Sequence, residues 1–174
     1  MILGLDLSLT HTGVVVLDLD GDNPVMVDVI KPKTNKEIRL VEIRDKVNDF
    51  VTRCNPTLIV LEGYSFASQG RAVYDIGEMG GVVRVHLYES KRRYMVVPPH
   101  SLKKFVTQKG NSPKQIMIRE VYRRWKREFD DDNICDAYGL AKVGQAVLAL
   151  ENGTKKMTDF HSYEQISLQS LLKG

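Results

Sequence analysis

The stretch "LGLDLSLTHTG", residues 3–13, decides the fold because it places an acid inside an apolar strand. Leucine and glycine surround Asp6, and burial of a lone carboxylate is costly unless it has a partner or a cation. A short polar segment follows and ends at Gly13, which permits a tight reversal of the chain. We therefore expect strands over Ile2–Leu7 and Gly13–Asp18, paired antiparallel, with Asp6 on the first.

The remaining elements follow outward from this hairpin. A turn at residues 21–24 predicts a third strand over 24–30, which completes an antiparallel meander. Periodicity then predicts helices over 36–53, 71–89, 112–128 and 132–150, and strands over 57–61 and 93–98. Ser112 is expected to cap the third of these helices, with Pro113 in its first turn. Antiparallel strands followed by alternating helix and strand predict a mixed α/β sheet.

Composition places the chain among globular proteins. Its 174 residues, 43% hydrophobic and 27% charged, suit one domain whose core is stable without disulfide bonds or a structural metal ion. Cys54 and Cys135 form no CxxC pair, so we expect a reducing compartment and read each as a core residue rather than a ligand. No signal peptide and no apolar run of about 18 residues is evident, which predicts a cytoplasmic protein with no membrane partner.

Positive charge is concentrated in one segment. Residues 91–127 contain 12 Lys and Arg and one acid, Glu120, for a net charge of +11, whereas the whole chain carries +3 and the remainder therefore −8. Segregation of this kind indicates a polyanionic partner for one face. The alternative is that these basic residues form a helix face that is exposed to solvent and binds no partner.

Three acids fall at the edges of buried elements. Asp6 lies in the first strand, Glu62 ends the buried strand "TLIVL", and Asp136 lies just inside the last helix. Each has a simpler explanation alone, as a turn cap, a solvent-facing acid or a helix N-terminal acid. Together they can converge on one point, where their repulsion calls for a divalent cation such as Mg²⁺ or Mn²⁺.

The segments "LGLDLSLTHTG", "LIVLEGYSF" and "DNICDAYGLA", in this order, resemble the RuvC-type Holliday junction resolvases of the ribonuclease H-like superfamily. The likeness covers about residues 1–150, a nuclease domain, and leaves 151–174 as a C-terminal tail of unknown role. It implies an α/β fold: a ribonuclease H-like mixed five-stranded sheet, three antiparallel strands then parallel ones, with helices on both faces. The small size and charged character of the chain resemble the phage-encoded branch of this family, whose members would act in the host cytoplasm.

The activity that the resemblance implies is metal-dependent nicking of four-way (Holliday) junctions and other branched DNA by two-metal phosphodiester hydrolysis. Asp6, Glu62 and Asp136 match the metal-binding carboxylates, with two Mg²⁺ (or Mn²⁺) ions per active site and Asp6 bridging them. The family usually has a fourth ligand, acidic or histidine, where this chain has Asn133, which brings no charge. Asp132 shares a helix face with Asp136 and is the expected substitute, also counted among the catalytic acids.

The resemblance also implies DNA contacts. Lysines that support catalysis or bind DNA match the segment "SLKKFVTQKGNSPK", which holds Lys103, Lys104, Lys109 and Lys114. These lysines would neutralise phosphates with little regard to sequence. Tyr64 and Phe66 lie where the family offers an aromatic that unstacks bases, although either could be a core residue. Residues 71–89 are similar to the helix through which the family forms a homodimer, which two matched cuts require; their small residues suit packing on the sheet equally well.

Two other functions remain open at this point. An actin-like or sugar-kinase-type ATPase also opens with a strand, an acid and a Thr-Gly turn, but is usually about twice as long and has a second phosphate-binding loop, which we do not find. A non-catalytic branched-DNA-binding module would keep the fold without the chemistry. The three acids argue against that module, and Asn133 argues for it.

Overall fold

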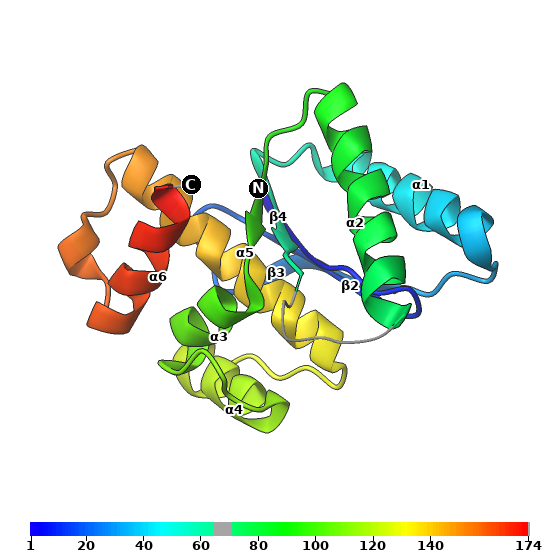
Figure 1. The fold of residues 1–174 in the computed structure, drawn as a ribbon. Helices are drawn as coiled ribbons and strands as arrows, with labels where there is room; N and C mark the ends of the chain where they lie inside the picture. The colour runs from blue at the N-terminus through cyan, green and yellow to red at the C-terminus, as the bar shows by residue number, and fades with distance from the viewer. Residues whose placement is uncertain (65–70, 174) are drawn as a thin grey trace.

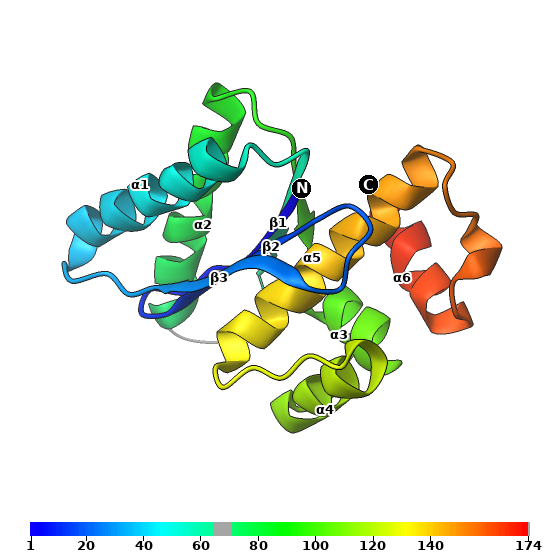
Figure 2. The same cartoon turned by 180° about the vertical axis from the view of Figure 1, so that it is seen from behind.

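The computed structural model describes residues 1–64 and 71–173, which form a five-stranded sheet with helices on both faces (Figure 1, Figure 2). The strands are β1 (Ile2–Asp6), β2 (Thr12–Leu17), β3 (Pro24–Ile30), β4 (Leu58–Glu62) and β5 (Tyr94–Val97), in the order β3-β2-β1-β4-β5. β1, β2 and β3 pair antiparallel, whereas β4 runs parallel to β1 and to β5. The predicted mixed sheet is confirmed.

The helices are α1 (Lys36–Cys54), α2 (Arg71–Glu89), α3 (Pro99–Thr107), α4 (Lys114–Trp125), α5 (Asp132–Glu151) and α6 (Ser162–Leu172), with a 3₁₀ turn over Met157–Asp159 before α6. The predicted α1, α2 and α5 agree with these bounds within one residue. α3 and α6 were not predicted. The predicted N-cap is wrong: Pro113 occupies that position, and buried Ser112 instead bonds the Thr107 hydroxyl (2.6 Å) and the Lys109 carbonyl (3.0 Å).

Alternation along the strands divides the core into two layers. Leu3 and Leu5 pack with Val14 and Val16 under α1 and α2. The intervening positions, such as Ile2, face α5. Because side chains alternate between faces, Asp6 lies on the same face as Ile2, toward α5.

Two glycines let α5 lie directly on the sheet. A Cβ atom added at Gly4 of β1 would come within 2.1 Å of the Ala137 carbonyl oxygen. One added at Gly13 of β2 would come equally close, 2.1 Å, to the Asn133 carbonyl oxygen. The first turns of α5 therefore rest against strand backbone, with Asp136 between the two points of closest approach.

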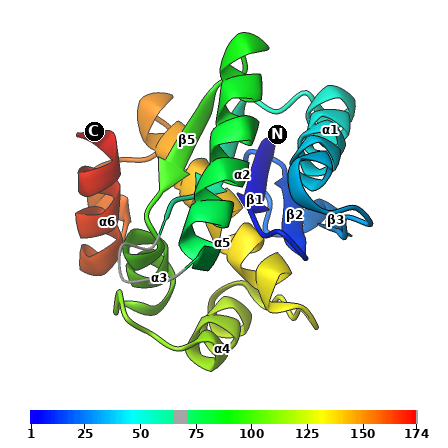
Figure 3. The same cartoon turned by 45° about the vertical axis from the view of Figure 1, so that its right-hand side comes forward.

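The C-terminal segment folds back on the helices beside α5. Figure 3 shows α3 between α6 and α4, and Leu168 of α6 is fully buried in the same cluster as Leu102 and Phe105 of α3. The division of the chain near residue 150 into a domain and a tail stays a prediction. Within the described ranges, no helix is both long and apolar enough to cross a membrane.

Candidate functional site

Asp6 and Glu62 end neighbouring parallel strands on the same face of the sheet. The register pairs Leu5 of β1 with Leu61 of β4, which brings the next residue of each strand side by side. Asp6 is only 8% exposed, and its side chain hydrogen bonds with that of Glu62. When both carboxyl groups are charged they repel one another, so the neutral form of one of them is favoured.

Asp136, in the second turn of α5, faces this pair. Burial, followed by the charges of Glu62 and Asp136, raises the pKa of Asp6 well above its usual value. Burial and then the charge of Glu62 raise the pKa of Asp136 to about 7. The pKa of Glu62 is also raised, by burial. The three acids predicted from sequence therefore lie together as a mutually repelling cluster, in which Asp6 is buried and Glu62 and Asp136 are half-buried.

The donor chemistry of this cluster fits a hard divalent cation. All of its ligating atoms are carboxylate oxygens, which Mg²⁺ prefers, and a cation would relieve the repulsion that raises the pKa values. Among the described residues, no three His, Cys, Asp or Glu side chains already lie close enough to bind one metal ion together, so a cation would have to draw these carboxylates nearer to one another.

The two candidates for a fourth ligand are both engaged elsewhere. Asp132 forms an ion pair with Lys114, and this hydrogen bond lowers the pKa of the Asp132 carboxyl. The amide nitrogen of Asn133 donates to Asp131 Oδ1 at 2.8 Å. Asp131 is the N-cap of α5 and also accepts from the Asn133 backbone nitrogen at 2.8 Å. Sequence reasoning missed both the cap and the Lys114–Asp132 pair.

The predicted DNA-binding lysines occupy two zones. Lys103 of α3 and Lys114 of α4 lie close enough to the carboxylates that their charges lower the pKa of Glu62. Lys104 is half-buried on α3, and Lys109 is exposed in the connection between α3 and α4. The structure therefore brings two of the four lysines to the acidic cluster.

Tyr64 is packed against α2. Its hydroxyl donates to the Gly77 carbonyl oxygen (3.0 Å) and accepts from Arg84 Nη2 (2.6 Å), while the Arg84 guanidinium carbon lies 5.1 Å from the centre of the ring. These contacts give Tyr64 a packing role, and its contact with DNA stays a prediction. Phe66 lies outside the described residues.

The polar turn after β1 is held by its own hydroxyl groups. Thr12 Oγ1 donates to the Ser8 carbonyl oxygen (2.8 Å) and accepts from the Ser8 backbone nitrogen (3.0 Å). Thr12 is fully buried, so this pair fixes the reversal from β1 to β2. The turn thereby aligns Gly13 with Asp6 across the antiparallel pair.

The raised pKa of Asp136 predicts how stability varies with pH. An acid whose pKa is higher in the folded than in the unfolded state stabilises the fold at low pH, and this stabilisation is lost as pH rises through the folded value, here about 7. In chelator, Asp136→Asn should therefore raise the free energy of unfolding at pH 8 by about 2 kcal/mol and change it little at pH 4.

Denaturant unfolding of both proteins at the two pH values measures this difference. Asp20→Asn, in the exposed turn between β2 and β3, is the matched control and should leave the pH dependence unchanged. An Asp136→Asn protein that is less stable than the parent at pH 8 would contradict the predicted repulsion.

Comparisons with known proteins identify the family of the chain. The family model described as crossover junction endodeoxyribonuclease RuvC matches residues 2–144, a range that contains every carboxylate discussed above. A crossover junction endodeoxyribonuclease RuvC from Prochlorococcus marinus is 26% identical over 149 residues, which is 82% of this chain and 96% of that protein.

Two solved structures share the fold. Thermus thermophilus RuvC in complex with Holliday junction substrate has a TM-score of 0.72 at 22% identity, covering 89% of this chain and 97% of that chain. The yeast mitochondrial Holliday junction resolvase has a TM-score of 0.62 at 12% identity, covering 97% of this chain and 80% of that chain.

Proposed function

The chain belongs to the RuvC family of crossover junction endodeoxyribonucleases, and we propose that it cuts four-way DNA junctions at the cluster of Asp6, Glu62 and Asp136. The observation that carries this proposal is the convergence of one buried and two half-buried acids from β1, β4 and α5 on one face of the sheet. A module that only binds DNA would gain nothing from three carboxylates that repel one another. An ATPase activity is disfavoured because the matched family consists of nucleases.

The cluster is the proposed site for two Mg²⁺ ions, for which Mn²⁺ can substitute. Asp6, Glu62 and Asp136 would hold the ions, with Asp132 or Asn133 as the fourth ligand. When bound, such ions supply the Lewis acidity that activates water and stabilises the departing 3′ oxygen. The chain's own contribution is rigidity, since β1 holds Asp6 between two hydrogen-bonded neighbouring strands.

The lysines are proposed to bring the DNA strand to these acids. Lys103 and Lys114 place positive charge beside a strongly acidic cluster, where a phosphate would otherwise be repelled. Lys104 and Lys109 would bind phosphates farther along the strand, which adds affinity but no sequence preference. Binding should therefore weaken steeply as salt is raised.

The decisive experiment incubates the protein with labelled four-way junctions, forks, flaps and linear duplex, with Mg²⁺ or with chelator. We expect nicking of the branched DNA only with Mg²⁺, and little cutting of duplex. An absence of metal-dependent cutting on every branched substrate would overturn the proposal. Junction binding without cutting would favour the DNA-binding module, and ATP hydrolysis would favour the ATPase.

A cytoplasmic location stays a prediction.

We also propose that the protein acts as a homodimer through α2. From residue 74 onward, where its side chains are described, this helix exposes four large hydrophobic side chains: Tyr74 (75%), Ile76 (40%), Val85 (57%) and Tyr88 (77%). Apolar side chains gathered along one helix are typical of a protein interface. Two copies related by a two-fold axis would present two cutting sites to the matched strands of a junction.

Val85→Glu should convert this dimer to a monomer, because it would bury a charge at the apolar contact. Light scattering after size-exclusion chromatography measures the mass directly. The matched control is Val25→Glu on the edge strand β3, where the valine is similarly exposed (53%) and should leave the mass unchanged. A Val85→Glu protein that remains dimeric would place the interface elsewhere.

A further inference from the structure

Arg124, in the last turn of α4, caps the end of α3. Its Nη1 donates to the carbonyl oxygens of Phe105 (2.7 Å) and Val106 (3.1 Å). Carbonyl groups in the last turn of a helix have no partner within the helix, and a cation there also opposes the negative end of the helix dipole. The guanidinium therefore stabilises the end of α3.

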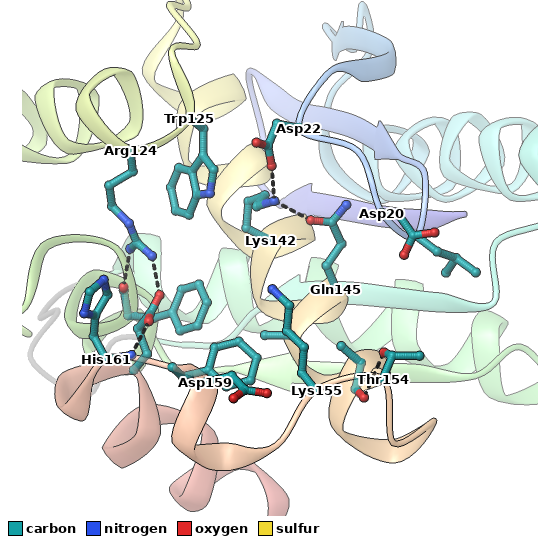
Figure 4. A pocket seen from close by; sticks show the side chains of 16 residues that line it. Asp20, Asp22, Arg124, Trp125, Lys142, Gln145, Thr154, Lys155, Asp159 and His161 are labelled. Carbon is teal, nitrogen blue, oxygen red and sulfur yellow. Dashed lines mark hydrogen bonds and ion pairs between the residues drawn. The ribbon is translucent and has the colours of Figure 1, made fainter.

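The other end of the same guanidinium binds the C-terminal segment. Arg124 Nη2 forms an ion pair with Glu164 of α6, in the wall of a cavity of about 580 Å³ (Figure 4). Both side chains are nearly buried, with 13% and 6% of their surface exposed. The second carboxylate oxygen of Glu164 accepts from the His161 backbone nitrogen at 2.8 Å, at the start of α6. One buried carboxylate thus joins the start of α6, through Arg124, to the end of α3.

Apolar packing reinforces this link. Leu168 of α6 has no exposed surface and lies in one cluster with Leu102, Phe105 and Val106 of α3. The Arg124 guanidinium carbon also lies 4.1 Å from the centre of the Trp125 ring. α3 is consequently held between α6 and α4 (Figure 3).

The position of α3 matters because this helix carries Lys103, whose charge reaches Glu62 and Asp136. We infer that residues 152–173 are a positioning element for cutting: the Arg124–Glu164 pair holds α3 so that Lys103 stays beside Glu62 and Asp136. The segment lies beyond residues 2–144, which the family model matches. This inference rests on the proposed function and assigns to the segment a role in the same site.

Glu164→Gln tests the inference with little change in shape, because an amide oxygen can still accept from the His161 nitrogen. We expect junction cutting at saturating DNA and Mg²⁺ to slow about tenfold at a temperature where the variant is fully folded. The matched control is Glu151→Gln, which removes the exposed ion pair between Arg93 and Glu151 (2.6 Å) and should cut at the parent rate. A Glu164→Gln protein that cuts at the parent rate would overturn the inference.

Combination with Lys103→Ala separates positioning from a general loss of stability. If Glu164 acts through Lys103, the double variant should cut no more slowly than Lys103→Ala alone. If the fold-loss in cutting rate of the double variant equals the product of the two single fold-losses, Glu164 does not act through Lys103. That result would overturn the inference.

Amide hydrogen exchange in chelator gives a readout that needs neither metal nor DNA. We expect amides of α3 to exchange about tenfold faster in Glu164→Gln, with β1 and α1 unchanged. If that variant does not fold, Arg124→Lys takes its place, because a lysine keeps the charge but cannot donate to both the carbonyl groups and Glu164. Unchanged exchange in α3 would count against the link. A parent protein that cuts no junction would instead refute the proposed function.

Discussion

Asp6→Asn should reduce cutting of a four-way junction by about a thousandfold or more, while junction affinity in chelator stays within about twofold. Asparagine keeps the shape of the side chain, so β1 and its pairing with β4 should survive. The substitution removes the charge at the centre of the cluster, where Asp6 hydrogen bonds Glu62 and faces Asp136. Without that charge the remaining acids should bind divalent cations poorly.

The same substitution should stabilise the cation-free protein, because it removes a buried acid whose pKa is raised by burial and by two neighbouring charges. Cutting rates, junction affinity and thermal unfolding in chelator, measured on one preparation, would establish all three effects. Asp28→Asn on β3, an exposed acid in the same sheet, is the matched control and should change none of them. An Asp6→Asn protein that still cuts would show that the metal site lies elsewhere.

Gly4→Ala should have the second large effect, because its methyl group would lie 2.1 Å from the Ala137 carbonyl oxygen. Neither the strand backbone nor the helix backbone can rotate away from this contact, so α5 must move off the sheet. We expect a loss of about 1–3 kcal/mol of stability from this overpacking. Asp136 moves with the helix, so cutting should fall by about a hundredfold even where the variant is folded.

Gly21→Ala provides the control for this substitution. Gly21 lies in the turn between β2 and β3, where an added Cβ would have its nearest neighbour at 4.0 Å. Stability from denaturant unfolding and cutting rates at a permissive temperature should therefore match the parent protein. A Gly4→Ala protein with parental stability would mean that α5 does not lie against β1 as described.

Much of the fold could be predicted because its signals are local. These signals depend only on residues a few positions apart in the sequence. They are the alternation in β1 and β2, the apolar run of β4 and the acid at the end of that run. Asp6, Glu62 and Asp136 stand out because each lies in or at the edge of a buried element, and their metal-binding role is what the family resemblance implies. The structure adds the register of β1 with β4, which puts Asp6 beside Glu62.

Other features depend on contacts that no local pattern carries. α3 begins at Pro99, in a Pro98-Pro99 pair that indicated only the end of a strand. Two carbonyl groups in its last turn accept from Arg124 of the next helix. α6 is stabilised by burial of Leu168 and by the Arg124–Glu164 pair, both long-range. The run of acids before α5 offers several possible caps, and only the structure shows that Asp131 is the one used.

The three acids of the site come from distant parts of the chain: Asp6 near its start, Glu62 in its first half and Asp136 near its end. Contacts across such separations form late in folding, since long loops must close before any favourable contact is made. During synthesis, β1 and β4 leave the ribosome before α5, so a nascent chain holds two of the acids but has no cutting site. If these acids form the cutting site, as proposed, nuclease activity would arise only when α5 has docked, and an unfinished chain would leave DNA intact.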